Sequence, residues 1–424
     1  MNWSERTAPP NFRWNFLAYI VDIVSFSFAL SFISVDTIAP ALVSQVTSSA
    51  LLIGLVGTIF RGAWLIPQLA IAQAIKDKPR KKPYLLPGII GRIAALGMMI
   101  AALFGGAASR PGLLLAIVYV SLSLFAISDG VIAVAWFDIL ARVIAVQRRG
   151  RLFGIGQAVG RLLGMGAGVI VARVLGNPAL AFPSNYGVLY VLAMIGLAPS
   201  AIALLVLREP PSSAPADQEP VEGALGWLGA LRADRTFRRL ISCRILVSTL
   251  LLCSSFFVVH AADVAHLPES VLGQFVIAQT LGGLVASLVL GWVSERFGPR
   301  AVIRIGTGLS ALAPMFGVFS DLTGGSVLLY YGIFIALGVW YSIWSLGFFN
   351  YLLEIAPENL RPVYIGAGNT IIGITTLAPI AGGWLLERTS YLSLFATTAV
   401  LMGLAFLLSL RLRKSSSAGE RGGY

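Results

Sequence analysis

Long runs of apolar residues alternate along this chain with short polar segments. Each run is close to the 20 residues that a helix needs to cross the hydrocarbon core of a bilayer. The apolar runs cover residues 14–38, 50–74, 84–106, 112–140, 152–175, 186–207, 238–261, 270–292, 300–319, 326–352, 364–386 and 391–411. This pattern predicts an all-α membrane protein with twelve transmembrane helices.

The chain also contains a faint internal repeat at half its length. Residues 137–157 align without a gap with residues 349–369, which lie 212 positions downstream in a chain of 424. The identical pairs are Phe137 and Phe349, Leu140 and Leu352, Arg149 and Arg361, Gly154 and Gly366, and Gly156 and Gly368. In both copies an apolar run is followed by a polar loop with an arginine and then by a second apolar run. We therefore expect two pseudo-symmetric halves of six helices, as in transporters built from repeats.

The polar segments set the expected boundaries of these halves. We expect an N-terminal six-helix half at 1–208, a cytoplasmic linker at 209–237, a C-terminal half at 238–412 and a disordered tail at 413–424. The linker begins with a proline-rich stretch, which favours an extended chain. The segment 221–238 has an apolar stripe opposite charged residues, which is typical of a short helix lying on the membrane surface.

Composition and charge agree with a membrane protein and suggest its orientation. Hydrophobic residues make up 57% of the chain, charged residues only 12%, and the net charge is +12. Most lysines and arginines fall in alternate loops and in the two terminal segments, whereas the opposite loops hold only Arg110, Arg173 and Arg388. The positive-inside rule then places both termini in the cytoplasm. We expect a bacterial inner-membrane protein whose basic loops contact lipid headgroups and not nucleic acid.

The loop after the eighth apolar run carries a recognisable motif. It reads Gly291-Trp-Val-Ser-Glu295-Arg296-Phe-Gly298-Pro299-Arg300, which resembles the signature G-x-x-x-D-R-x-G-R-R of the major facilitator superfamily. Pro299 departs from it by replacing a basic residue. The equivalent loop of the first half is degenerate, because Asp77 and Lys78 fit the signature but Gln73 and Arg80 stand where it has glycines.

This resemblance extends over the whole chain and implies a fold and a mechanism. It implies that spans 1, 4, 7 and 10 surround a central cavity and that the protein works by alternating access. It also implies that the signature residues Gly291, Glu295, Arg296, Gly298 and Arg300, with Asp77 and Lys78, form a latch between helices. Ordinary loop charges explain the first-half copy about equally well. The family default is a monomer, and the resemblance names no substrate.

Ionisable residues inside the apolar runs are the main candidates for function, because a charge at mid-bilayer is costly and usually has a partner or a task. Asp22, Asp129 and Arg161 all lie roughly 12 to 17 Å from the cytoplasmic ends of their spans, counted at the helical rise, and Arg61 lies near the middle of its span. Two interpretations of the aspartates are open: fixed salt bridges with Arg161 or Arg61, or sites for a coupling proton or cation. The arginines could equally contact an anionic substrate.

Other polar and aromatic residues within the spans complete the set. In the 212-residue alignment Asp129 corresponds to Tyr341, so the second half should offer an uncharged wall to the cavity. We expect this wall to consist of Gln279, Trp340, Tyr341, Trp344, Asn350 and Asn369. Arg92 and Arg244 are expected to extend toward the cytoplasmic surface, His260 to be structural, and Asp36 to mark the outer end of the first span.

The sequence favours a transporter over an enzyme. It shows no phosphate-binding glycine loop, no metal-ligand cluster and no nucleophile arrangement, so we expect no enzymatic activity, no cofactor and no metal. We predict secondary active transport of a small organic solute, coupled to protons, with export slightly favoured. The alternatives are proton-coupled uptake of a sugar or organic acid, and a non-transporting sensor or scaffold built on the same fold.

Overall fold

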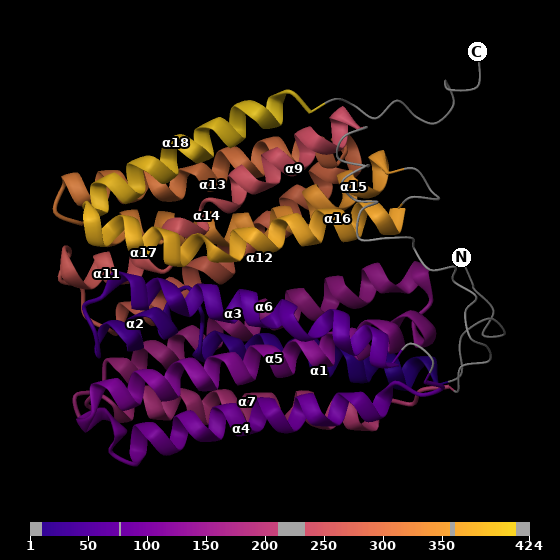
Figure 1. The fold of residues 1–424 in the computed structure, drawn as a ribbon, viewed down its shortest axis with the longest axis horizontal. Coiled ribbons are helices and arrows are strands. Elements are labelled where there is room, and N and C mark those ends of the chain that lie inside the picture. Colours follow the sequence, from indigo (N-terminus) through magenta and orange to yellow (C-terminus); the bar gives the residue numbers. More distant parts are fainter. Residues whose placement is uncertain (1–10, 76–77, 211–233, 357–360, 413–424) are drawn as a thin grey trace. The chain divides into compact units, whose positions relative to one another are not determined.

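The computed structural model describes residues 11–75, 78–210, 234–356 and 361–412, and within these ranges the chain is helical with no strand. Long helices run beside one another in each part of the molecule (Figure 1). The chain divides into two compact units. The first comprises Met1–Asp217 with Leu267–Ile277, and the second comprises Gln218–His266 with Ala278–Tyr424.

Among the described residues, seven α-helices lie entirely in the first unit. They are α1 (Phe12–Phe32), α2 (Ile38–Ser44), α3 (Ala50–Ile75), α4 (Leu85–Phe104), α5 (Pro111–Val143), α6 (Val146–Leu175) and α7 (Ser184–Val206). Prolines stand at or near the first positions of α5 and of the short turn η2 (Lys82–Tyr84), where a missing N–H costs no helical hydrogen bond. The helix α12 (Val271–Phe297) begins in the first unit and continues in the second.

The second unit holds shorter and more interrupted helices. They are α9 (Arg235–Ser248), α10 (Leu251–Ser254), α11 (Phe256–Asp263), α13 (Pro299–Leu322), α14 (Val327–Ile343), α15 (Asn350–Ile355), α16 (Arg361–Gly373), α17 (Ala378–Arg388) and α18 (Tyr391–Leu410). A π-helical turn, η4 (Trp344–Phe349), joins α14 to α15, and a 3₁₀ turn, η6 (Ile374–Leu377), joins α16 to α17. Asp234 caps α9 by accepting hydrogen bonds from the backbone N–H groups of Thr236 and Phe237.

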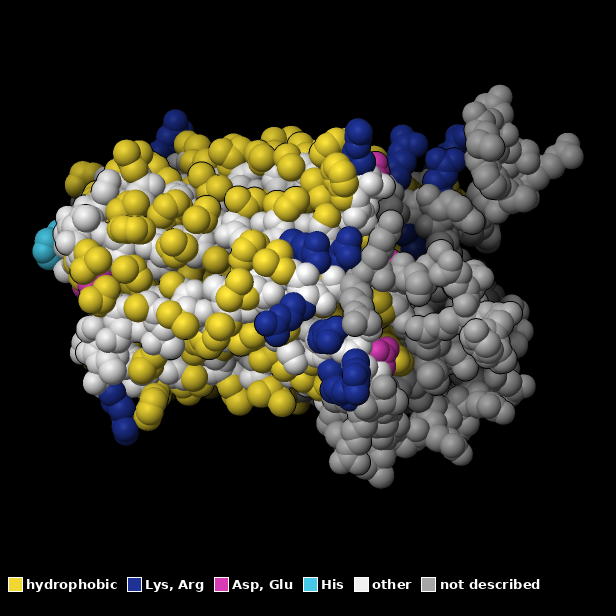
Figure 2. Space-filling view, turned by 90° about the horizontal axis from the view of Figure 1, so that it is seen from above, with side chains coloured by type: hydrophobic (Ala, Val, Ile, Leu, Met, Phe, Trp, Pro, Cys, Tyr) yellow, Lys and Arg dark blue, Asp and Glu magenta, His cyan; other side chains and the backbone are white. Residues whose placement is uncertain are grey.

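The prediction of twelve transmembrane helices is confirmed. The described residues contain 12 helical segments that are long and apolar enough to cross a bilayer. Large apolar side chains, among them Leu17, Ile66 and Leu328, are exposed. Figure 2 shows apolar side chains spread over the face in view, with most of its lysines and arginines in the half toward one end. An apolar exterior of this extent needs lipid around it.

Corresponding spans pack together in both units, as the internal repeat predicts. In the first unit the first span packs against the fifth and sixth (α1 against α6 and α7), and the third against the fourth and sixth (α4 against α5 and α7). In the second unit α9 packs against α18, α10 against α17, and α13 against α14 and α18. These are the same pairs of spans counted from the start of each half.

Residues 267–277 belong to the first unit, although the sequence analysis assigned them to the C-terminal half, and the division between the units falls within the expected linker, after Asp217. The linker from residue 211 to 233, with most of the predicted amphipathic helix, and the tail from residue 413 lie outside the described residues.

Candidate functional site

Asp22 lies in the interior of the first unit and is held by two neutral donors. Its side chain is buried on α1. The indole Nε1 of Trp136 donates to Asp22 Oδ2 at 2.7 Å, and the hydroxyl of Ser200 donates to Oδ1 at 2.6 Å. No ion pair to Asp22 occurs among the described residues. Sequence reasoning singled out Asp22 but missed Trp136 and Ser200, since nothing in the sequence relates α1 to positions more than 100 residues away.

Asp129 forms an ion pair with Arg92, which differs from the expected partners Arg61 and Arg161. The guanidinium Nη2 of Arg92 on α4 contacts Asp129 Oδ1 on α5. Arg92 also lies over the ring of Phe26, with its Cζ 4.6 Å from the ring centroid. Its side chain is only 7% exposed, so the expectation that it extends toward the cytoplasmic surface is wrong. The α4 and α5 backbones approach closely at Gly88 and Gly91, and this approach brings the pair together.

Arg61 pairs with Asp36, so Asp36 does more than mark the end of a span. The first predicted span is interrupted after α1, and Asp36 lies in the break before α2. Arg61 Nη2 on α3 lies 2.8 Å from Asp36 Oδ1, and the carboxylate side chain is 3% exposed. Arg61 also donates to the backbone carbonyl of Gly57. The four ionisable candidates of the first unit are therefore not one cluster, since Arg61 belongs to a separate pair.

Arg161 lies half-buried on α6, one residue after Gly160. The glycines of this helix allow close packing against α1: a Cβ at Gly156 would meet Ile23, and one at Gly160 would meet Ser27. Arg161 is thus carried on a helix that is held against the helix of Asp22.

Three of the expected cavity residues lie around the end of α14 in the second unit. Trp340 Nε1 donates to the carbonyl of Val247 on α9 at 2.9 Å, and its ring meets Tyr341 edge to face at 5.0 Å. Trp344 begins the π-helical turn and is 46% exposed. Its ring covers the guanidinium of Arg244, whose Cζ lies 3.3 Å from the ring centroid.

Arg244 is a functional candidate that sequence reasoning placed wrongly. We expected it to extend toward the cytoplasmic surface, but it is 5% exposed. Its Nε and Nη2 atoms are shielded from solvent and have no hydrogen-bond partner among the described residues. The signal that could have found it is its position four residues after Leu240, where the apolar part of α9 begins, with no acidic residue one turn away.

The remaining amide candidates are spread over three helices. Gln279 is half-buried on α12, where the backbones of α12 and α14 approach closely at Gly338. Asn350 is exposed, and its amide donates to the carbonyl of Leu346. Asn369 is exposed on α16, next to Gly368, which lies beside Arg244. Of these three, only Asn369 lies next to a residue that borders the buried guanidinium.

The signature loop forms the sharp connection between α12 and α13. Gly298 has a φ of 80°, a conformation that favours glycine, and its N–H donates to the carbonyl of Ser294. Glu295 and Arg296 are exposed at the end of α12, and Arg296 lies near the ring of Trp292. Gly291 and Arg300 are half-buried. In the first-half copy Asp77 lies outside the described residues, while Lys78 N donates to the carbonyl of Ile75.

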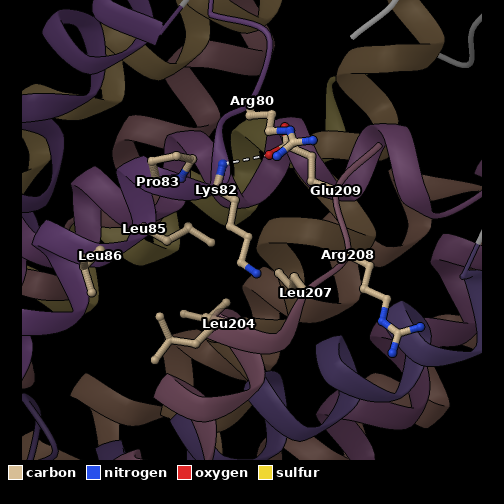
Figure 3. Close-up of a pocket in the computed structure, with 10 residues that line it drawn as sticks. Arg80, Lys82, Pro83, Leu85, Leu86, Leu204, Leu207, Arg208 and Glu209 are labelled. Carbon is tan, nitrogen blue, oxygen red and sulfur yellow. Dashed lines mark hydrogen bonds between the residues drawn. The ribbon is translucent and has the colours of Figure 1, made fainter. Parts of the chain in front are cut away.

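A pocket beside this first-half loop lies between α4 and the end of α7 (Figure 3). Its lining is mixed, with Arg80, Lys82 and Arg208 among leucines of both helices. The buried carboxylate of Glu209 accepts hydrogen bonds from the backbone N–H groups of Lys81 and Lys82 at 2.8 to 2.9 Å and pairs with Arg142 at 3.4 Å. Arg208 in turn donates to Asn11 Oδ1 at 3.1 Å and lies over the ring of Trp14.

Two further polar sites lie outside the set of predicted functional residues, one fully buried and one half-buried. His260 is fully buried, with Nδ1 2.6 Å from the hydroxyl of Tyr330 and Nε2 3.0 Å from Asp321 Oδ1, which agrees with the structural role we expected. Glu269, in the segment before α12, accepts hydrogen bonds from Gln45 at 2.6 Å and Asn185 at 3.1 Å. Burial raises the pKa of Glu269, against the lowering effect of these two hydrogen bonds.

The fold and the buried charges define a multi-pass membrane protein built from two six-helix units. A family model described as Major Facilitator Superfamily matches residues 16–377 and 266–423, and the chain belongs to this family of transporters. The resemblance drawn from the signature loop is thereby confirmed.

Similar proteins agree at the level of fold. The structure of a bacterial homologue of the human lysosomal transporter Spinster, inward-facing and unoccupied, matches 96% of this chain and 99% of its own with a TM-score of 0.67 and 16% identity. A bacterial homologue of the iron transporter ferroportin, also inward-facing, matches 95% of this chain and 98% of its own with a TM-score of 0.66 and 15% identity. Identities this low show the fold alone.

Two curated relatives have detectable sequence similarity. An uncharacterised protein of Mycobacterium tuberculosis is 25% identical over 291 residues, which are 66% of this chain and 55% of that protein. The match therefore spans little more than half of that relative's length. A gentisate transporter of Corynebacterium glutamicum is 30% identical over 153 residues, 35% of this chain and 34% of that protein.

Proposed function

We propose that this protein is a secondary active transporter that moves a small organic solute by alternating access and is driven by protons. The observation that carries the proton coupling is Asp22. It is a buried carboxyl group within a membrane span, held by the neutral donors Trp136 and Ser200. When Asp22 takes up a proton, no buried cation loses its counter-ion. Protonation of Asp129, by contrast, would leave the buried guanidinium of Arg92 without its anionic partner. Asp22 is thus our candidate for the coupling proton, and Asp129 for a structural ion pair.

Proteoliposomes with the purified protein test this proposal. A pH gradient is imposed, and internal pH is followed while lipophilic cations, sugars and organic acids are added in turn. We expect one class to give substrate-dependent proton movement, which Asp22→Asn abolishes while solute exchange at equal pH persists. The Asn variant keeps the shape of the side chain, and the hydroxyl of Ser200 can rotate to accept from its amide. Coupled proton flux that is unchanged in Asp22→Asn would refute the assignment.

Export and uptake remain two candidate directions. Export was slightly favoured on the sequence, but organic acid uptake gains support from the relative named as a gentisate transporter, because gentisate is a carboxylic acid. Orientation-controlled vesicles distinguish the two directions, since uptake with protons and exchange against protons produce pH changes of opposite sign. A protein that binds its ligand but moves neither solute nor proton would be the sensor or scaffold that we regard as the alternative from another class.

We also propose that both termini face the cytoplasm, based on the distribution of lysine and arginine among the loops. The two native cysteines, Cys243 and Cys253, are buried, so single cysteines introduced into loops can be labelled selectively. A cysteine at Ser270, before α12, should react with an impermeant maleimide in intact cells, and one at Arg80 should react only after lysis. The reverse pattern would overturn this orientation.

Membrane lipid is the partner that we propose for the pocket of Figure 3. Basic side chains beside leucines suit an anionic headgroup with its acyl chains, and Lys82 extends over Leu204 and Leu207 in this view. Native mass spectrometry should detect retained phosphatidylglycerol or cardiolipin, with less retained in Lys82→Gln. Equal retention in both proteins would contradict the assignment.

A further inference from the structure

The guanidinium of Arg244 is buried without an anionic partner among the described residues. The residue is 5% exposed, and its Nε and Nη2 have no hydrogen-bond acceptor in the described part of the chain. The contact that the structure gives its guanidinium is the ring of Trp344. A cation–π contact offsets only part of the cost of removing a cation from water. An anion that binds here would remove the remaining imbalance.

The two unsatisfied atoms define the shape of that anion. Nε and Nη2 lie on the same edge of a guanidinium, and their N–H groups point in parallel. A carboxylate fits this edge with two hydrogen bonds, one to each of its oxygens. A ligand with only one acceptor atom cannot form both. The other terminal nitrogen, Nη1, faces Gly368 on α16, where an added Cβ would lie 3.8 Å away. Glycine at this position therefore leaves space along the guanidinium.

Trp344 supplies both a cover and a flat apolar surface. One face of its ring lies on the guanidinium, and 46% of the side chain is exposed. It is also the first residue of the π-helical turn between α14 and α15, and such turns are frequently found at functional sites. The Nε and Nη2 edge is closed to solvent in this conformation, so a ligand reaches it only when neighbouring side chains move. The exposed part of the indole offers a surface on which a ring of the ligand can stack.

We propose that Arg244 and Trp344 form a substrate subsite for a carboxylate borne on a flat aromatic ring. The carboxylate binds the Nε and Nη2 edge of Arg244, and the aromatic ring stacks on Trp344. This inference rests on the proposed transport function, because it names the class of solute. It also assigns to Arg244 the anion contact that the sequence analysis gave to Arg61 and Arg161.

Binding to the purified full-length protein in detergent, measured by calorimetry, tests the subsite without any transport. The probes are benzoate, the neutral benzamide and the non-aromatic cyclohexanecarboxylate. We expect benzoate to bind at least about tenfold more tightly than benzamide, which is what loss of a charged hydrogen-bonded contact amounts to. We expect it to bind about two- to tenfold more tightly than cyclohexanecarboxylate, which keeps the carboxylate but loses the stacking of an aromatic ring. Arg244→Gln and Trp344→Leu should each weaken benzoate binding by about tenfold or more. Arg239→Gln, the same substitution five residues earlier on α9, should leave it unchanged.

Folding of the variants is checked by their thermal unfolding temperature. Arg244→Gln removes an uncompensated buried charge, so its unfolding temperature should equal or exceed that of the parent. Arg244→Lys keeps the positive charge but loses the planar pair of N–H donors that binds both carboxylate oxygens. This variant should remain folded and bind benzoate more weakly. Absence of benzoate binding to the parent protein, equal binding of benzamide, or unchanged binding in folded Arg244→Gln would each overturn the proposal.

Flux measurements on the same preparation separate the two proposals. If the protein transports another class of solute but does not bind benzoate, the proposed subsite is refuted and the proposed transport function stands. Benzoate binding that depends on Arg244, in a protein that moves no solute, would keep the subsite and refute transport.

Discussion

Replacing Asp129 by asparagine should destabilise the first unit, because Arg92 would lose its counter-ion inside the protein. The Arg92 side chain is 7% exposed and that of Asp129 is 20% exposed. Breaking a buried ion pair by removing one partner costs about 3 to 5 kcal/mol. The asparagine carbonyl can still accept one hydrogen bond, and solvent reaches part of the site, so we place the loss near the lower limit, at about 3 kcal/mol.

The assay is thermal unfolding of the purified protein in detergent, followed by tryptophan fluorescence. One kcal/mol shifts the unfolding temperature by about 2 to 4 °C in a domain of 150 to 250 residues, so Asp129→Asn should lower it by about 6 to 12 °C. The matched control is Asp138→Asn on the same helix. Asp138 pairs with Arg142 at 2.6 Å, but these side chains are 35% and 24% exposed, and such a pair contributes about 0 to 1 kcal/mol.

A double-mutant cycle with Arg92→Met shows whether the loss arises from the pair. When both members of a buried pair are replaced, no charge is left uncompensated, and the change is often close to neutral. The double variant should therefore be more stable than Asp129→Asn alone by at least about 1.5 kcal/mol. Additive losses, or an Asp129→Asn variant as stable as the parent, would refute the structural assignment of Asp129 and return it to the candidates for the coupling proton.

Three further predictions concern buried polar groups and close helix contacts. His260→Phe keeps most of the buried volume but removes the partner of Tyr330 and of an aspartate on α13, so stability should fall by about 1 to 3 kcal/mol, measured by thermal unfolding; no loss would contradict the network. The pKa of Glu269 is raised by burial, so the folded state should gain stability as the pH falls through this pKa, and the gain should level off below the ordinary value of 4.5. Thermal unfolding measured against pH should show this component in the parent protein and not in Glu269→Gln. Identical pH profiles of the two proteins would refute the prediction. A Cβ at Gly382 would collide with the backbone of α10, whereas one at Gly403 meets nothing within 4 Å; Gly382→Ala should destabilise by about 1 to 3 kcal/mol and Gly403→Ala should not, and equal unfolding temperatures would contradict the close contact.

The positions of the spans could be predicted because each depends only on local composition. A helix in lipid satisfies its own backbone hydrogen bonds, so a sufficient apolar run specifies it without reference to the rest of the chain. Interruptions within spans were less predictable. The break before Asp36 and the π-helical turn at Trp344 depend on which helices pack nearby. The 3₁₀ turn η6, by contrast, lies just before Pro379, which is visible in the sequence and cannot donate the N–H of a continuous helix.

The candidate site shows the same division. Asp22 and Asp129 were found from the sequence because charges stand out in apolar runs, yet their partners were not, since the sequence does not show which neighbouring helix faces each one. The pairing of Asp129 with Arg92 depends on the close approach of α4 and α5. Arg244 was judged by its distance from the end of its helix, whereas its burial results from the ring of Trp344, 100 residues later, lying over it.

The amino-acid sequence alone was sufficient to assign this protein to its class: a membrane protein of twelve helices in two related halves, a member of the major facilitator superfamily. Local hydrophobicity, loop charge and a short motif are sufficient for that, because a bilayer selects helices by composition and length. The packing of the helices was needed to show which buried charges are neutralised and which are not. Asp36 and Asp129 have arginine partners, Asp22 has neutral donors, and Arg244 has a tryptophan face. Those differences arise from distances of a few ångströms between side chains on different helices, and electrostatic energies inside a membrane protein depend on such distances.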